Sequence, residues 1–465
     1  MKKFILLGMM CLCANVFAQA SSTDAPTEKQ YRFRLSLTDK NGSEFSINHP
    51  EKFLSQKALD RRQRQGIQVN ETDLPIPSAY LKQIKGKGAK IHSLSKWANT
   101  VLVEVKDSLK GVALAELPFV SKSTCVWSTP APKAPRGPQR SADYKRQDMV
   151  SKDPVELNEQ KYGEAQNQAE MLNVTKLHDA GFRGQNLTIG VIDGGYMNAD
   201  VIPAFDNIQI LGTYNVVDPK SSVYDGQSHG TSVLSCMGMN KDNMMIGTAP
   251  SSKFWLIASE DAASETPAEL DYWAAAVEYA DSVGCDLVNS SLGYNDFDDP
   301  FADMKYWELD GKSNPGSIAA GMAADKGMIC VISAGNSGAQ AWKKITPPAD
   351  ADHILCVGAT DSLGINTTFS SIGYSSDGRV KPDVCAQGGK SAVVGPTGKV
   401  GRANGTSFAS PIMCGAVAAL WSALPNLTAH QVIDLVRKNG SYVEHPNEVY
   451  GYGIPDLWKA YQSAR

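Results

Sequence analysis

Residues 404–420 read Asn404-Gly-Thr-Ser-Phe-Ala-Ser-Pro-Ile-Met-Cys-Gly-Ala-Val-Ala-Ala-Leu420, a glycine-containing turn that runs into an apolar helix of small residues. This pattern places the hydroxyl of Ser407 at the helix start, where backbone N–H donors have no partner within the helix and the helix dipole is positive. An activated serine fits that position, but an ordinary capped helix begins with the same residue types. Other segments are needed to decide between the two interpretations.

Two such segments carry a carboxylate and an imidazole. Leu187–Asp193 is an apolar, β-rich run that ends in Asp193 and two glycines. It predicts a buried parallel strand, and the carboxyl ends of such strands are where open α/β sheets place their sites. His229 opens a predicted helix and is followed by Gly230. A metal-binding role for His229 is disfavoured, because no second histidine or cysteine lies near it at zinc-ligand spacing.

Asp193, His229 and Ser407 supply the orienting acid, the base and the nucleophile of a serine hydrolase. In this chain order, and with the motifs around them, they make the chain resemble the subtilisin-like serine proteases over roughly residues 162–460. The motifs, in the order of the family, are Val-Ile-Asp193-Gly-Gly, His229-Gly-Thr, Ser290-Ser-Leu-Gly293, Ser333-Ala-Gly-Asn336-Ser-Gly, Lys381-Pro-Asp-Val-Cys-Ala-Gln-Gly388 and Gly405-Thr-Ser407-Phe-Ala-Ser-Pro411.

The sequence departs from the pattern of this family at two positions. Gly194 stands where the family commonly has threonine or serine, which removes a hydroxyl that helps to hold the carboxylate. Phe408 replaces the usual methionine after the nucleophile, and we expect this change to affect mainly packing. Neither departure removes a catalytic group.

The resemblance also implies roles for residues outside the triad. Asn336 and the backbone N–H of Ser407 are expected to form the oxyanion hole, although an asparagine in a left-handed turn is the alternative. A substrate-pairing strand is expected at 288–294, with a plain core strand as the alternative. The residues implied to bind substrate are Ser290, Ser291, Leu292, Gly293, Ala334 and Gly335.

Composition limits the classes of protein that remain. The chain has 465 residues, of which 42% are hydrophobic and 20% charged, which is typical of a soluble globular protein with a sizeable core. Its net charge of −4 gives no basic surface for nucleic acid. Nine cysteines include Cys11 and Cys13 near the N-terminus, and the odd remainder favours buried free thiols over disulfides. This applies to Cys236, Cys285, Cys330, Cys356, Cys385 and Cys414.

The first residues predict export. Residues 1–18 combine two lysines with a short apolar run and small residues, as a signal peptide does, with cleavage expected after Ala18 or Ala20. The run is too short to be a convincing membrane span. Lipid attachment at Cys11 or Cys13 is the weaker alternative, because the preceding Met10 or Leu12 is not the small residue that such processing prefers. We expect a secreted or periplasmic protein with no membrane segment in its mature form.

A small α/β domain is predicted over residues 19–128. Its expected strands are 31–37, 99–105 and 119–126, and its expected helices are 77–84 and 109–117. Its position resembles that of the subtilisin propeptide, which implies an intramolecular inhibitor that also assists folding; a permanent accessory domain is the alternative. Residues 129–160 are rich in proline and charge, as a linker is, and we expect processing there, with Lys145-Arg146 as one candidate site.

The catalytic domain is expected over residues 161–465 as an α/β fold of the subtilisin-like, three-layer type, with a mainly parallel sheet covered by helices on both faces. Expected strands are 187–193, 253–259, 285–291, 328–334 and 353–359. Expected helices are 168–181, 229–239, 268–283, 315–326, 407–423 and 428–438.

No cofactor is expected to be required for the chemistry. Asp296, Asp298, Asp299 and Asp303 could bind structural calcium, but the calcium ligands of the family cannot be transferred to them, so a solvated acidic loop is favoured. The resemblance therefore implies a secreted serine endopeptidase that forms an acyl-enzyme, is made as a zymogen and acts on polypeptides. The alternatives are a serine esterase or acyl transferase and a non-catalytic binding protein on the same fold.

Overall fold

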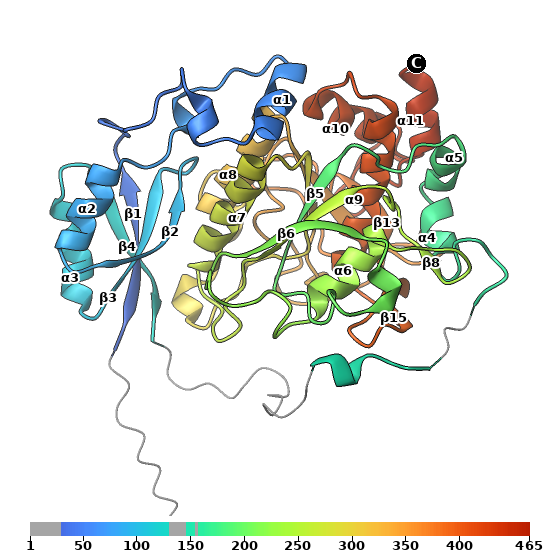
Figure 1. Ribbon diagram of the computed structural model, residues 1–465, viewed down its shortest axis with the longest axis horizontal. Helices are drawn as coiled ribbons and strands as arrows, with labels where there is room; N and C mark the ends of the chain where they lie inside the picture. Colours follow the sequence, from blue (N-terminus) through green and yellow to red (C-terminus); the bar gives the residue numbers. More distant parts are fainter. Residues whose placement is uncertain (1–28, 130–145, 154–156) are drawn as a thin grey trace, which may run out of the picture.

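The computed structural model describes residues 29–129, 146–153 and 157–465. A small N-terminal domain lies beside a larger domain that holds the three candidate catalytic residues (Figure 1). The predicted signal peptide and residues 130–145 of the predicted linker fall outside the described residues.

The N-terminal domain is an antiparallel sheet in the order β2-β3-β1-β4. One face packs on α2 and α3 through a core that includes Phe33, Ile84 and Leu114. The sequence did not predict β2 or α1, because α1 carries almost no apolar residues and buries arginines instead. The elements are β1 (Tyr31–Leu37), α1 (Gln56–Arg64), α2 (Ser78–Gly86), β2 (Lys90–Ser95), β3 (Thr100–Val105), α3 (Ser108–Ala113) and β4 (Val120–Ser128).

The larger domain is built on a seven-stranded parallel sheet in the order β13-β12-β11-β10-β5-β9-β6. The predicted strands are present, and the sequence analysis missed the partly exposed edge strand β6 and the short strand β13. The strands are β5 (Thr188–Asp193), β6 (Gln209–Asn215), β9 (Lys253–Ala258), β10 (Leu287–Ser290), β11 (Ile329–Ser333), β12 (Leu355–Thr360) and β13 (Val384–Gln387).

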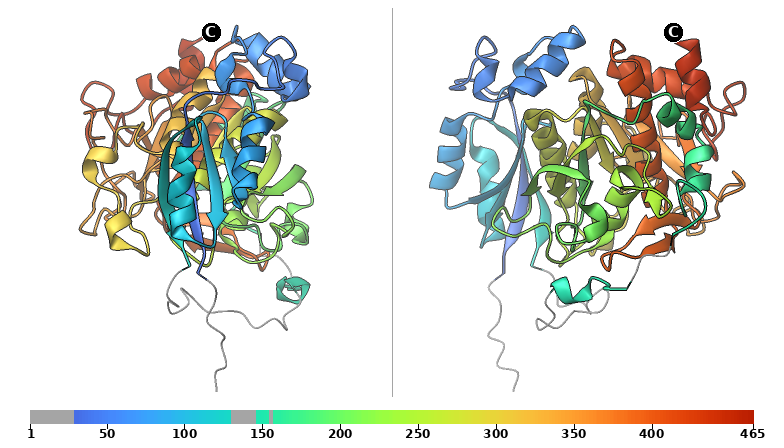
Figure 2. Two further views of the ribbon diagram at one scale, coloured as in Figure 1. Left: turned by 90° about the vertical axis from the view of Figure 1, so that its left-hand side faces the viewer. Right: turned by 45° about the vertical axis from the view of Figure 1, so that its right-hand side comes forward.

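Helices cover both faces of this sheet, because successive strand side chains point to opposite sides. Val191 belongs to the core shared with α6 and α9, whereas its neighbour Ile192 belongs to the core shared with α7 and α8. The N-terminal sheet then covers α7 from outside (Figure 2). These helices are α6 (His229–Gly238), α7 (Glu269–Val283), α8 (Pro315–Asp325) and α9 (Thr406–Ala423). The predicted three-layer fold is confirmed.

One helix prediction was wrong in detail. The helix expected over 168–181 is two short helices, α4 (Gln166–Glu170) and α5 (Val174–Asp179), because Asn173 between them adopts φ +54°. The remaining elements are α10 (Ala429–Lys438), α11 (Leu457–Ser463) and the short hairpins β7 (Asn240–Lys241) with β8 (Met245–Ile246) and β14 (Ser391–Val394) with β15 (Val400–Ala403).

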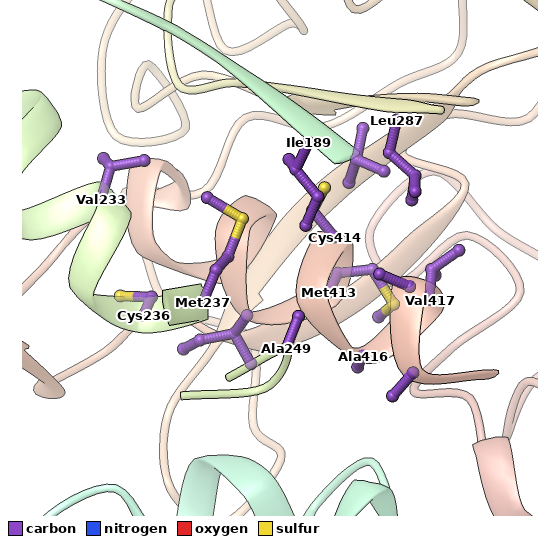
Figure 3. Packing of buried hydrophobic residues seen from close by; sticks show 14 of the residues in the cluster. Ile189, Val233, Cys236, Met237, Ala249, Leu287, Met413, Cys414, Ala416 and Val417 are labelled. Atoms are coloured by element: carbon purple, nitrogen blue, oxygen red, sulfur yellow. The ribbon is translucent and has the colours of Figure 1, made fainter. Parts of the chain in front are cut away.

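Helix α9 runs through the centre of the core. Its residues Met413, Cys414 and Val417 pack against strand residues and against α6 (Figure 3). The helix is long and apolar enough to cross a membrane, but 83% of it is buried inside the domain. The six cysteines predicted as buried free thiols are confirmed as such, and Cys125 on β4 is free and exposed.

Candidate active site

The carboxyl edge of the sheet collects the candidate residues. Strand β5 ends at Asp193, which is in register with Ala258 at the end of β9. The segment 290–293 follows β10, and Asn336 follows β11. Parallel strands present their carboxyl ends at one edge, and the residues far apart in the sequence therefore meet there.

Asp193 holds His229 in a fixed orientation. The Nδ1 atom of His229 lies 2.8 Å and 3.0 Å from the two carboxylate oxygens of the fully buried Asp193. The backbone N–H of Gly194 donates to the same carboxylate at 2.8 Å. A Cβ at 194 would lie 2.3 Å from Oε1 of Gln227, so a larger residue there requires this side chain to move. The Asp193 carboxylate raises the pKa of His229 above its ordinary value, although burial opposes this effect.

Close packing explains the glycine after His229. The N–H of Gly230 donates to the carbonyl of Gly195 at 3.0 Å, and a Cβ at 230 would lie 2.6 Å from that oxygen. The Asp193 loop and the start of α6 can approach each other because this Cβ is absent. Phe408 lies on the other side of the imidazole, with ring centroids 5.8 Å apart, so the residue expected to affect packing contacts His229 itself.

Ser407 is the second residue of α9 and is 8% exposed. Gly405 precedes the helix at φ +153°, a conformation that L side chains rarely adopt. The Ser407 hydroxyl donates to the carbonyl of Ser291 at 3.3 Å, and the Ser291 hydroxyl donates to the carbonyl of Ser407 at 2.8 Å. The bond of the Ser407 hydroxyl to Ser291 takes the place of one to His229, to which no hydrogen bond is formed. Such bonds often tighten only when substrate is bound.

Asn336 is exposed at the same edge, and its amide is oriented by Thr406. The Oδ1 atom of Asn336 accepts from the backbone N–H of Thr406 at 2.9 Å and from the Thr406 hydroxyl at 3.0 Å. The Nδ2 group forms no hydrogen bond to any described residue, so it is left as a donor. The left-handed conformation in this loop belongs to Gly335, at φ +104°, and not to Asn336.

The six residues implied to bind substrate do not all offer free polar groups. The backbone N–H and C=O groups of Leu292 and Gly293 form no hydrogen bond to the described residues. The Ser290 hydroxyl, in contrast, accepts from Trp273 at 2.8 Å. The backbone N–H and C=O groups of Ala334 and Gly335 are already bonded within the protein. Leu292 and Gly293 therefore offer both backbone groups for a main-chain partner, whereas the backbone of Ala334 and Gly335 is already engaged.

Two acids near the triad, the half-buried Glu260 and the buried Glu269, were not predicted from the sequence. Glu260 follows β9, accepts a hydrogen bond from the Tyr294 hydroxyl and interacts electrostatically with His229. Burial raises the pKa of Glu260 to about 8 and that of Glu269 to about 12. No motif marks these residues, and the register of β9 beside β5 brings Glu260 close to Asp193.

The acidic loop 296–303 binds its own backbone. Asp303 accepts from the N–H of Phe297 at 2.8 Å, and Asp299 accepts from the N–H of Phe301 at 3.0 Å. The described residues contain no group of three or more His, Cys, Asp or Glu side chains arranged to hold a metal ion. A hollow of about 1390 Å³ is lined by residues that include Val150, Leu157 and Lys399, and no triad residue lines it.

Arg146 of the predicted linker is bound to the larger domain. Its guanidinium pairs with Asp200 at 2.8 Å and 3.0 Å and with Asp225 at 3.1 Å. Its partner in the predicted dibasic site, Lys145, lies outside the described residues. Arg146 is therefore less accessible to a protease than a free linker residue.

Comparison with known sequences decides the family. A sequence model described as the subtilase family matches residues 184–453, which is more than half of the chain. The chain belongs to the subtilase family. A second model, described as a peptidase S8 propeptide domain of Bacteroidota, matches residues 32–142, so the N-terminal domain of this subtilase is a propeptide domain. As a family member it is a serine endopeptidase, and its chemistry requires no cofactor.

Individual relatives are similar over the same region. Subtilisin DY from Bacillus licheniformis is 29% identical over 56% of this chain and 86% of the relative. Subtilisin BL from Lederbergia lenta is 28% identical over 60% of this chain and 91% of the relative. The crystal structure of the epidermin leader peptide processing serine protease from Staphylococcus aureus superposes with a TM-score of 0.64 at 17% identity. It covers 94% of this chain and 99% of that one, and it supports the fold alone.

Proposed function

We propose that this subtilase is an exported serine endopeptidase, made as a zymogen, that cleaves polypeptides through Asp193, His229 and Ser407. The observation that carries the proposal is the bond between His229 Nδ1 and Asp193, because it leaves Nε2 as the basic atom beside the start of α9. An imidazole held in that tautomer is the base that a serine hydroxyl needs at neutral pH.

In the first chemical step the Ser407 oxygen attacks the carbonyl carbon of the scissile bond while His229 accepts the hydroxyl proton. The imidazolium that forms is stabilised by Asp193, and it then gives the proton to the leaving amine. An acyl-enzyme remains on Ser407. Water attacks it in the second step, with His229 again accepting and returning the proton.

The developing oxyanion is stabilised by two donors. The Nδ2 group of Asn336 is one, since Thr406 occupies the Oδ1 atom and leaves Nδ2 as the only hydrogen-bonding group of the amide without a partner in the described chain. The backbone N–H of Ser407 is the other, at the positive end of α9. Both are fixed before substrate arrives, so little reorganisation is needed in the transition state.

A peptide substrate binds along 292–293. The unpaired backbone groups of Leu292 and Gly293 allow an extended chain to add as a strand through main-chain hydrogen bonds. Gly293 has no room for a side chain, because a Cβ there would lie 2.0 Å from the Thr346 hydroxyl. Binding through main-chain groups favours polypeptides over small esters.

The propeptide domain acts as an intramolecular inhibitor. The indole N–H of Trp127, near its last residue, donates to the Ser264 hydroxyl at 3.0 Å. Ser264 lies in the loop after β9, so the chain leaves the propeptide sheet at the triad edge. We assign residues 1–18 to a signal peptide, 19–128 to the propeptide domain, 129–160 to a linker that is processed and 161–465 to the catalytic domain.

Two experiments test the proposal. The processed enzyme should hydrolyse casein, and a fluorophosphonate should abolish hydrolysis by labelling Ser407; labelling without peptide cleavage would favour an esterase. The full-length Ser407→Ala variant, expressed in the same host, should remain uncut in the linker. Cutting at the normal rate would refute self-processing, but it would not contradict the proposed peptidase activity of the unmutated enzyme.

A further inference from the structure

Residues 55–73 of the propeptide domain form a separate contact with the catalytic domain, which we name the docking arm. It consists of α1 and the short turn Glu71–Asp73. In Figure 1, α1 lies at the top of the molecule, at the end opposite to α6, whose first residue is His229. The arm contacts Asp286, which directly precedes β10. It therefore binds the amino edge of the sheet, whereas the triad lies at the carboxyl edge.

The contact is built from buried charges. Arg62 bridges Asp73 of the arm and Asp281 of α7, with nitrogen to oxygen distances of 2.9 Å to Asp73 and of 2.9 Å and 3.0 Å to Asp281. Arg61 also binds Asp281, and it donates to the backbone carbonyl of Lys326 at 3.2 Å. All these side chains are 0–2% exposed. Water therefore screens these charges little, and neighbouring charged side chains of the two domains compensate them.

Among the described residues, the cation partners of Asp281 and Asp286 all come from the propeptide domain. Within the described residues, the cations paired with Asp281 are Arg61, Arg62 and Lys96. Asp286 pairs with Lys57 at 3.2 Å and Arg64 at 3.1 Å. In the opposite sense, Lys326 of the catalytic domain binds Asp73 of the arm at 2.9 Å. We name Asp281, Asp286 and Lys326 the acidic socket.

Backbone carbonyls next to the socket also accept hydrogen bonds from the arm. The N–H of Ser55 donates to the carbonyl of Ser282 at 3.0 Å, and Gln65 donates to the carbonyl of Gly327 at 2.8 Å. These carbonyls lie at the C-terminal ends of α7 and α8, where the helix dipole is negative and favours cations. A Cβ on Gly284 would lie 2.7 Å from Lys57, so the arm rests directly on the glycine that ends α7.

We propose that the acidic socket is a second docking site for the propeptide domain, which takes the arginine pair of the arm and holds the domain on the enzyme independently of the substrate cleft. The proposal extends the proposed zymogen function, because it applies after the linker has been cut. The cleaved domain then remains attached at the socket as well as along α7, where Glu278 accepts from the backbone N–H groups of Lys96 and Trp97. Release of the domain requires Arg61 and Arg62 to separate from Asp281, and displacement of the domain from the substrate cleft alone is insufficient.

The test uses the full chain. A recognition site for a sequence-specific protease is inserted in the linker of the Ser407→Ala protein, the chain is cut, and the rate at which the propeptide domain dissociates is measured. We expect the Arg61→Gln/Arg62→Gln variant and the Asp281→Asn variant each to dissociate about 100-fold faster, because truncating one partner of a buried charge pair acts mainly on the dissociation rate. Lys85 is exposed and forms no hydrogen bond or ion pair with the described catalytic-domain residues, so the control variant Lys85→Ala should dissociate at the unmutated rate.

Folding of each uncut variant is checked by near-ultraviolet circular dichroism. A second measurement needs no mutation at the socket: the cut, active-site-intact protein is labelled at Ser407 with a peptidyl phosphonate that fills the cleft. We expect the propeptide domain to remain bound after labelling. Dissociation on labelling, or unmutated rates in both socket variants, would overturn the docking proposal. Neither result bears on the zymogen proposal, which is tested by the activity of the uncut chain.

Discussion

The oxyanion donor provides a sharp test of the active-site geometry. Replacing Asn336 with alanine removes the Nδ2 donor but leaves the triad bond between Asp193 and His229 intact. One preorganised donor to an oxyanion is worth roughly 10²–10³ in kcat, which is about 2.7–4 kcal/mol. We expect kcat to fall with little change in KM, because the donor forms a stronger hydrogen bond to the oxyanion of the transition state than to the carbonyl of the bound substrate.

A second substitution at this position separates charge stabilisation from packing. Asn336→Asp keeps the size of the side chain and an oxygen to accept the two bonds from Thr406, but it places a carboxylate oxygen where the donor was. We expect it to be less active than Asn336→Ala, because like charge then faces the oxyanion.

Both variants are assayed as processed enzymes, with kcat and KM measured on a chromogenic peptide. The exposed Gln340 of the same loop serves as the control, and Gln340→Ala should retain normal kcat. The reasoning is refuted if Asn336→Ala retains kcat within about threefold of the unmutated enzyme, a loss well below the range expected for an oxyanion donor. It is also refuted if the aspartate variant is the more active of the two.

Three further outcomes are expected. Asp193→Asn should lower kcat by about 10⁴ in the same assay while KM changes little, because the tautomer of His229 is no longer fixed; a loss below about tenfold would contradict the assigned role. Burial raises the pKa of Glu260 to about 8, so its negative charge forms as pH rises through that value and stabilises the nearby imidazolium. The kcat/KM of the processed enzyme should therefore keep rising through about pH 8, whereas the kcat/KM of the Glu260→Gln variant should level off at a lower pH. Identical pH profiles of the two enzymes would contradict this role of Glu260. Burial tends to raise the pKa of Asp281, but Arg61 and Arg62 outweigh it and hold the pKa below its ordinary value. Docking is therefore favoured above the ordinary carboxyl pKa, and it weakens as pH falls towards the lowered pKa of Asp281. Gel filtration of the cut protein should show release of the propeptide domain at about pH 2–3 and retention at about pH 7. Retention at both pH values would contradict the assignment.

The sequence predicted most of the sheet because its strands are continuous apolar runs. Strands such as β5 and β12 are buried at every position, and their composition alone distinguishes them from loops. The edge strand β6 alternates with exposed residues and was missed. Helix α1 was missed for a related reason, since periodicity analysis searches for apolar faces and α1 buries arginines whose partners lie more than 200 residues away.

The candidate site was predictable in its residues more than in its contacts. Short motifs around Asp193 and His229 placed the two side chains on a strand end and a helix start, which is where the structure has them. The role of Gly194 was not predictable, because the donor that replaces the missing hydroxyl is a backbone N–H and the space is filled by Gln227. The acidic neighbour Glu260 carries no local signal, and only the pairing of β9 with β5 brings it close.

The attachment of Asn336 to Thr406 has a mechanical consequence. Thr406 lies next to Ser407 in the first turn of α9, and its two bonds to Asn336 tie the proposed oxyanion donor to the helix that carries the proposed nucleophile. When α9 tilts, these bonds oppose a change in the spacing of the two groups. The imidazole of His229, in contrast, belongs to α6. A change in the packing of α6 against α9 therefore alters the distance and angle between His229 and the Ser407 hydroxyl. We therefore expect the proposed proton transfer to be more sensitive than oxyanion binding to substitutions in the core between α6 and α9.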